Sequence, residues 1–257
     1  MLKTIAGYDQ RDPATVDLPV PDYTRALRAA TSKLRVGVPR ALFFENLDPE
    51  VAEALEAAIG VLRKISSGVT ETTIPSAASI LPILRAEAYA YHSKSISESP
   101  DRYQPFTRDR IIQSADDKAA AYAEALRQTN LIRREITKVF SSVDLLITPT
   151  TPAAADAFTQ STTFDPNRFR NTAPFDVFGL PTISVPCGFT RSGLPIGLQI
   201  SGAPFAEPTV LALAHAYEQA TEWHKSRPKL NPAQQRSATV VADAARHGEC
   251  AEPGPRR

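Results

Sequence analysis

The sequence contains few residues of the types that build specialised sites, and it has almost no excess charge. Its 257 residues include two cysteines, one methionine, one tryptophan and four histidines, with 29 basic against 28 acidic side chains. A net charge of +1 gives no reason to expect a nucleic-acid or strongly acidic partner. The histidines show no metal-ligand spacing with each other or with a cysteine, so no metal site is expected.

Long apolar runs are also missing. No segment approaches the roughly 20 apolar residues of a membrane-spanning helix, and the N-terminal MLKTIAGYDQRDP has no apolar core of signal length. Cys187 lies in an apolar run and Cys250 in a distant polar stretch, which favours reduced thiols over a disulfide. The sequence therefore predicts a cytoplasmic protein without a membrane or nucleic-acid partner.

The common motifs for cofactor binding and nucleophilic catalysis are absent. There is no P-loop, no Gly-x-Gly-x-x-Gly and no Gly-x-Ser-x-Gly, so no cofactor is predicted. Ser66-Ser67-Gly68 places two serines beside one glycine, but a serine nucleophile also needs a base and oxyanion donors. We interpret this segment as a helix-ending turn. A hydrolase that uses Ser67 or Cys187 remains a weaker alternative.

Apolar periodicity predicts an α/β fold with about five strands in a mixed sheet that is covered by helices. A strand, a helix with Asp48 as N-cap and a second strand form a βαβ-like unit, and residues 76–140 are helical in pattern. The C-terminal helix is expected to turn Leu211, Ala214, Tyr217 and Ala220 inward. The expected segments are strands 34–38, 69–75, 143–148, 181–186 and 195–201, helices 49–64 and 208–223, and an amphipathic helix that carries Tyr122, Leu126, Thr129, Ile132, Ile136 and Phe140 on one face.

Glycine and proline mark the ends of several elements. Gly7 is expected to end a short helix whose start would lie further upstream. Gly193 is expected at positive φ in the turn of residues 190–193, and Pro186 where a strand bends. Residues 231–257 are polar and aperiodic, which predicts a disordered tail.

Three segments together resemble the amidase signature family: IAGYDQRDPATVDLPVPDY, DLLITPTTPAAA, and the long run from NTAPFDVFGLPTISVPCGF to AHAYEQATEWH. The resemblance extends from Leu2 to about Leu230. It implies an α/β/α domain around a mixed sheet, with residues 1–230 as its C-terminal portion. It also implies hydrolysis of small-molecule amides, or ammonia transfer in the A subunits of tRNA-dependent amidotransferases.

The same resemblance implies that the family's chemistry lies outside this sequence. The nucleophilic serine, a second serine joined by a cis peptide and the lysine base all precede the segment that matches IAGYD. We therefore expect a chain that is inactive alone and acts on an amide only when an N-terminal half completes it. An exposed sheet edge would then favour a homodimer. The alternative is a non-catalytic scaffold or binding protein derived from an amidase.

Pocket residues also follow from the resemblance. Loops after the strand 143–148 contribute substrate walls in the family, so the candidates here are Thr148, Pro149, Thr150, Asn171 and Thr172, with ordinary loop residues as the alternative. The A subunits of amidotransferases carry an acidic residue three positions before the threonine that matches Thr172. This chain has Phe169 there, which favours a general amidase.

Overall fold

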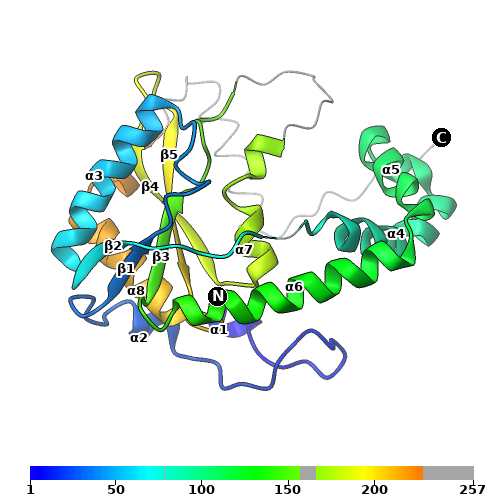
Figure 1. The fold of residues 1–257 in the computed structure, drawn as a ribbon, viewed down its shortest axis with the longest axis horizontal. Helices are drawn as coiled ribbons and strands as arrows, with labels where there is room; N and C mark the ends of the chain where they lie inside the picture. Colours follow the sequence, from blue (N-terminus) through cyan, green and yellow to red (C-terminus); the bar gives the residue numbers. More distant parts are fainter. Residues whose placement is uncertain (78, 157–165, 228–257) are drawn as a thin grey trace, which may run out of the picture. The chain divides into compact units, whose positions relative to one another are not determined.

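A computed structural model describes residues 1–77, 79–156 and 166–227 (Figure 1). The chain divides into two units, residues 1–224 and 225–257, and the first unit contains the whole sheet. Residues 231–257, predicted to be a disordered tail, lie outside the described residues. The elements are α1 (Leu2–Ile5), α2 (Tyr23–Ala26), β1 (Arg35–Val38), α3 (Pro49–Ile65), β2 (Gly68–Glu71), α4 (Leu81–Glu98), η1 (Pro100–Arg102), α5 (Pro105–Ile112), η2 (Gln113–Asp116), α6 (Ala119–Val139), β3 (Leu145–Pro149), η3 (Pro166–Phe169), α7 (Ala173–Phe178), β4 (Thr182–Phe189), β5 (Pro195–Gly202), α8 (Glu207–Ala220) and η4 (Trp223–Lys225).

The described strands form one mixed sheet in the order β2-β1-β3-β5-β4. β1 pairs in parallel with both β2 and β3, whereas β5 is antiparallel to β3 and to β4. The predicted βαβ unit and five-stranded α/β fold are therefore confirmed. The second strand is shorter than predicted and ends at Glu71, because β1 ends at Val38 and the last bond between them joins Thr72 N–H to Val38 C=O at 3.1 Å.

Helix α3 forms as its sequence predicts. The Asp48 carboxylate accepts a hydrogen bond of 2.8 Å from the Glu50 N–H, and Pro49 occupies the first turn, where its missing N–H costs nothing. The buried side chains recur every three or four residues, which places them on one face toward the sheet. They are Val51, Leu55, Ala58, Ile59 and Leu62.

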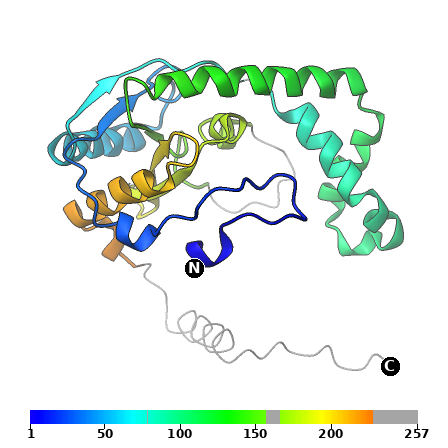
Figure 2. The ribbon, with the colours of Figure 1, turned by 90° about the horizontal axis from the view of Figure 1, so that it is seen from below.

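Helices cover both faces of the sheet and give the first unit three layers. One core lies between the strands and helices α3 and α8, and it includes Leu55, Leu198 and Tyr217. A second core lies on the opposite face, where Ile136 of α6 and Phe175 of α7 pack against Leu146. Figure 2 shows α6 on one side of the strands and α8 on the other. The α/β/α arrangement places the polar residues described below beside α7.

The buried face of α8 differs in phase from the prediction. Val210, Leu213, Ala214 and Tyr217 are buried, whereas Leu211 is half-buried and Ala220 is exposed. Val210 fixes this phase because its side chain lies over Gly202 of β5, where a Cβ atom would be 2.7 Å from Val210 Cγ2. The predicted helix also continued to Trp223, but α8 ends at Ala220.

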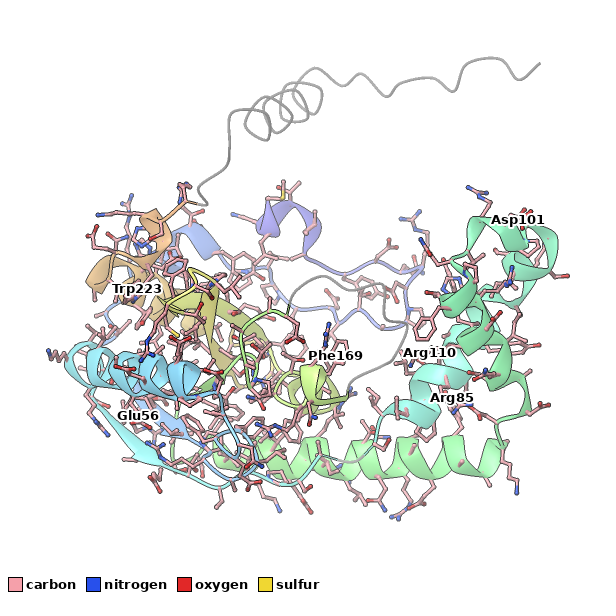
Figure 3. The ribbon with its side chains drawn as sticks, turned by 90° about the horizontal axis from the view of Figure 1, so that it is seen from above. Glu56, Arg85, Asp101, Arg110, Phe169 and Trp223 are labelled. Carbon is pink, nitrogen blue, oxygen red and sulfur yellow. The ribbon has the colours of Figure 1, made fainter. Side chains whose placement is uncertain are left out.

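The predicted helical region 76–140 comprises α4, η1, α5, η2 and α6. Only the C-terminal part of α6 packs on the sheet as predicted, through Ile132 and Ile136, and Phe140 directly after the helix joins them. Its N-terminal part contacts α4 instead, so Tyr122 and Leu126 are half-buried within a helical arm. Figure 3 shows Arg85 and Arg110 on this arm. None of the described helices combines the length and the apolar content needed to cross a bilayer.

The hairpin β4–β5 confirms the expected use of glycine and proline. Gly193 has φ +85° in the turn between the strands, where the Thr190 N–H donates to the Leu194 C=O at 2.8 Å. A register shift between Pro186 and Gly188 bends β4. Gly7 does not end α1 as predicted: the helix ends at Ile5, Ala6 is extended at the C-cap, and Gly7 follows at φ +139°, outside the left-handed helical region.

Candidate functional site

The parallel strands β1 and β3 place their carboxyl ends at the same edge of the sheet. Crevices at this edge are where open α/β sheets bind ligands. The loops that follow the two strands are joined by a hydrogen bond of 2.9 Å from the Asp48 N–H to the Pro152 C=O. The predicted residues Thr148, Pro149 and Thr150 lie at the end of β3 and the start of its loop. The candidate site is built around this edge.

Asn171 joins three segments that are distant in sequence. Its side chain is fully buried, and Nδ2 donates to the Pro149 C=O at 3.0 Å and to the Phe43 C=O at 3.3 Å. Phe43 belongs to the loop after β1 and Pro149 ends β3, so one amide holds both loops against the start of α7. Its Oδ1 accepts from Arg170 Nε at 3.3 Å. Asn171 therefore orders the edge of the sheet.

Gln199 of β5 completes this network, although the sequence analysis did not select it. Its Nε2 donates to Thr148 Oγ1 and to the Asn171 C=O, both at 2.9 Å, and Gln199 is only 2% exposed. The only feature of the sequence that could have indicated Gln199 is that it is a single side-chain amide within the apolar run PIGLQIS. A buried polar side chain needs partners, so that amide indicated a network whose members the sequence does not identify.

One face of the hairpin carries hydroxyl groups instead of apolar side chains. Strand side chains alternate between faces, so Gly197, Gln199 and Ser201 lie opposite the residues of β5 that pack on α3 and α8. Thr150 Oγ1 lies 2.7 Å from Ser184 Oγ, and Thr182 Oγ1 lies 2.9 Å from Ser201 Oγ. We call these four residues, Thr150, Thr182, Ser184 and Ser201, the hydroxyl face.

Gly197 makes room for the first of these hydroxyl pairs. A Cβ atom at this position would lie 2.6 Å from Thr150 Oγ1 and 2.7 Å from Ser184 Oγ, closer than packed atoms tolerate. The Thr150 N–H also donates to the Gly197 C=O at 2.9 Å. The two hydroxyl groups can therefore meet across the strand only because residue 197 has no side chain.

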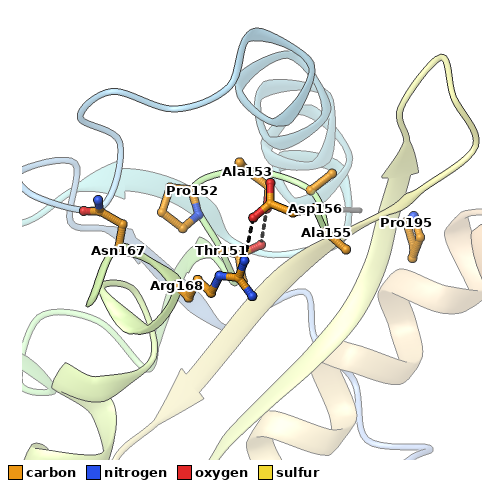
Figure 4. A pocket seen from close by; sticks show the side chains of 9 residues that line it. Thr151, Pro152, Ala153, Ala155, Asp156, Asn167, Arg168 and Pro195 are labelled. Carbon is orange, nitrogen blue, oxygen red and sulfur yellow. Dashed lines mark hydrogen bonds and ion pairs between the residues drawn. The ribbon is translucent and has the colours of Figure 1, made fainter. Parts of the chain in front are cut away.

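A pocket of about 480 Å³ opens next to the hydroxyl face, at the loop after Thr150 (Figure 4). Its charged groups include Arg168 and Asp156, whose Nη2 and Oδ2 atoms lie 2.8 Å apart. The five predicted residues are not among those that line it, and the pocket instead begins one residue after Thr150. The lining residues are Thr151, Pro152, Ala153, Ala154, Ala155, Asp156, Asn167, Arg168 and Pro195.

The structure thus brings together four of the five predicted residues in two groups. Thr148, Pro149 and Asn171 share the buried network, and Thr150 belongs to the hydroxyl face. Thr172 precedes α7 and lies outside both groups. Its hydroxyl lies 3.5 Å from the Phe169 C=O, and its side chain makes no capping bond to the helix. Phe169, near the centre of Figure 3, is half-exposed.

The two serines of the Ser-Ser-Gly segment serve the backbone. Ser66 Oγ donates to the Leu62 C=O at 2.7 Å as α3 ends, and Ser67 Oγ donates to the Leu34 C=O at 2.8 Å. They lie at the amino ends of β1 and β2, opposite the candidate site. This geometry supports the interpretation as a helix-ending turn.

Cys187 is buried in β4 within the core formed with α3 and α8. Burial raises the pKa of its thiol to about 12, because the apolar surroundings disfavour the thiolate. The thiolate is the nucleophilic form of cysteine. Cys187 therefore remains protonated at neutral pH and packs as a small apolar residue.

A sequence profile of the Amidase family matches residues 1–211. The chain belongs to the amidase family. It is 37% identical over 248 residues to an amidase of Pseudomonas putida, covering 90% of this chain and 52% of that protein. It is 35% identical over 263 residues to the A subunit of the glutamyl-tRNA(Gln) amidotransferase of Moorella thermoacetica, covering 91% of this chain and 54% of that one.

Solved structures of two enzymes share the fold. A 6-aminohexanoate cyclic dimer hydrolase complexed with substrate superimposes with a TM-score of 0.76 at 22% identity, covering 89% of this chain and 53% of its own. The A subunit of the glutamyl-tRNA(Gln) amidotransferase of Thermotoga maritima superimposes with a TM-score of 0.63 at 26% identity, covering 84% and 48%. The chain spans about half the length of the curated relatives it matches.

The chemistry available at the site is hydrogen bonding. Thr148, Gln199 and Asn171 are uncharged, and the hydroxyl face adds groups that both donate and accept. Such groups can orient a planar amide, which presents one C=O acceptor and N–H donors. None of them is a general base at neutral pH, and an amide bond is cleaved only when a nucleophile and a base are also positioned.

Proposed function

We propose that this chain forms part of a small-molecule amide hydrolase and contributes the substrate-facing wall of its pocket. The observation that carries the proposal is the buried network of Gln199, Thr148 and Asn171 at the carboxyl edge of the sheet, in a chain of the amidase family. The network fixes Pro149 and the loop that begins at Thr150. The hydroxyl face then presents Thr150 and Ser184 toward an amide in the adjoining pocket, which begins at Thr151.

We also propose that the chain does not hydrolyse amides by itself. Ser184 and Ser201 each pair with a threonine hydroxyl, which is not a base at neutral pH, and Ser66 and Ser67 donate to the backbone. The resemblance to the amidase signature family assigns the nucleophilic serine, the second serine and the lysine to a region before the matched segments. An N-terminal half that completes the enzyme would therefore supply the reacting groups. The proposed reaction needs no cofactor.

Two further properties belong to this proposal. Phe169 in place of an acidic residue favours a general amidase over an amidotransferase component, although both kinds occur among the relatives. Residues 1–230 form the amidase portion, with residues 231–257 as a tail. The cytoplasm is the proposed compartment, because reduced thiols such as that of Cys187 are typical there.

The test compares the purified chain with a complemented enzyme. Acetamide and benzamide are assayed for ammonia release with the chain alone and after co-expression with the N-terminal half of the Pseudomonas putida amidase. We expect no release above buffer by the chain alone and turnover by the complemented enzyme. Turnover by the chain alone that Ser67→Ala abolishes would overturn the proposed inactivity.

The pocket wall is tested in the complemented enzyme. Thr150→Val keeps the side-chain shape and removes the hydroxyl, so we expect KM to rise about fivefold, as for one lost hydrogen bond. Thr137→Val is the control, because Thr137 lies on the exposed face of α6 and bonds only the backbone. An unchanged KM in both variants would show that the hydroxyl face does not contact the substrate.

A further inference from the structure

The pocket of Figure 4 combines an ion pair with a wall of small side chains. Ala153, Ala154 and Ala155 form part of that wall, together with two prolines, and they offer a ligand no charged group. Arg168 Nη2 lies 2.8 Å from Asp156 Oδ2 across the opening. Among the described residues that line the pocket, the charged groups that a ligand would meet are Arg168 and Asp156.

This ion pair is weak enough to exchange partners. The side chains of Arg168 and Asp156 are 62% and 69% exposed, and pairs so accessible to water contribute about 0–1 kcal/mol. Arg168 bonds Asp156 through Nη2 only, whereas a guanidinium can grip a carboxylate with two parallel N–H groups. The Asp156 carboxylate thus pairs with the Arg168 guanidinium in an arrangement that a better-placed carboxylate can replace.

We propose that Arg168 binds a carboxylate of the substrate in place of Asp156, so that the site prefers small amides with a terminal carboxylate. The inference rests on the proposed function of this pocket. Because Thr151 lines the pocket and directly follows Thr150, a ligand anchored at Arg168 can extend its amide toward the hydroxyl face. A volume of about 480 Å³ accommodates such a molecule.

Binding without turnover tests the proposal on the full chain. ¹⁵N-labelled protein is titrated with succinamate and with succinamide, which have nearly the same shape and differ in one carboxylate. We expect the Kd of succinamate to be about fivefold lower, as for one exposed charge pair. Arg168→Gln should remove this preference and leave the Kd of succinamide unchanged. Asp156→Asn should tighten succinamate binding, because it removes the competing carboxylate.

Arg127→Gln is the matched control. Arg127 pairs with Glu124 on α6 at 2.7 Å, with exposures of 58% and 55%, so its loss changes net charge equally at a distant surface. Equal Kd values for the two amides, or an equal effect of both arginine variants on the preference for succinamate, would overturn the role of Arg168 but not the proposed pocket wall. If the chain binds neither amide, the proposed pocket wall is overturned together with this inference.

Discussion

Gln199 lies in the middle of β5 with its side-chain amide between acceptors from two other elements. Its Nε2 has two hydrogens, and both are used, one by Thr148 Oγ1 in β3 and one by the Asn171 C=O before α7. All three residues are at most 2% exposed, so water does not compete for these bonds. A buried polar group that loses its partner retains its full desolvation cost.

Replacement of Gln199 by leucine should therefore destabilise the chain. Gln199→Leu keeps a similar volume but leaves the Thr148 hydroxyl and the Asn171 carbonyl without their donor, at a cost of about 1 to 3 kcal/mol. The measurement is the free energy of unfolding in urea. Gln219→Leu on the exposed side of α8 is the control and should stay within about 0.5 kcal/mol of the original chain. Equal effects of the two variants would refute the network.

At this scale the sequence selected only some members of the buried hydrogen-bond network. Thr148 and Asn171 could be predicted because they lie in segments that resemble the family. Gln199 and Ser184 could not, because their partners are 28 to 51 positions away along the chain. Such contacts depend on strand register, which local patterns do not fix.

Strands β1 and β3 are joined at their amino ends by an ion pair. Asp144 Oδ1 lies 2.8 Å from Arg35 Nη2, and Oδ2 accepts from the Arg35 N–H at 2.7 Å. Arg35 Nη1 also donates to the Ser141 C=O at 3.0 Å. The Arg35 guanidinium lowers the pKa of Asp144 below its ordinary value, because its hydrogen bonds favour the carboxylate.

This lowered pKa predicts a pH dependence with a definite sign. The unfolded chain protonates Asp144 at a higher pH than the folded chain does, so the stabilisation is complete above about pH 4 and is lost as pH falls further. We expect Asp144→Asn to cost about 1 kcal/mol at pH 7 and progressively less toward pH 3. Urea unfolding over this range measures the difference. Asp101→Asn, at an exposed position, serves as the control, and a cost for Asp144→Asn that grows toward pH 3 would contradict the assignment.

Apolar periodicity predicted that the helices exist, but it predicted less well which residues each helix buries and which element it packs against. Helix α3 and its five buried residues follow directly from the pattern, because its N-cap and apolar face agree. The buried face of α8 differs from the predicted one because the Val210 side chain packs over Gly202, which has no side chain of its own. The N-terminal part of α6 has an apolar stripe suited to a sheet, but it contacts α4 instead. Spacing shows that a helix has a buried face without naming the partner.

The whole sheet ends at β2 on one side and at β4 on the other, within the described residues. The Gly202 N–H donates to the Pro181 C=O at 3.0 Å, and antiparallel pairs alternate between bonded and non-bonded residues. Thr182 and Ser184 therefore turn their backbone N–H and C=O groups toward the free edge of β4. Unpaired groups of this kind form a template for another strand.

We accordingly predict a homodimer through the edge of β4. Sedimentation equilibrium should show self-association of the chain, and Thr182→Lys should shift it to monomer, because a lysine on the edge opposes strand pairing. Thr70→Lys, at an exposed position of the opposite edge strand β2, should leave the dimer intact. A monomer at every concentration would exclude the dimer, whereas equal effects of the two lysines would place self-association elsewhere. If the N-terminal half of an amidase relative binds the same edge, its addition should dissociate the dimer. Ammonia release from an amide should then become measurable.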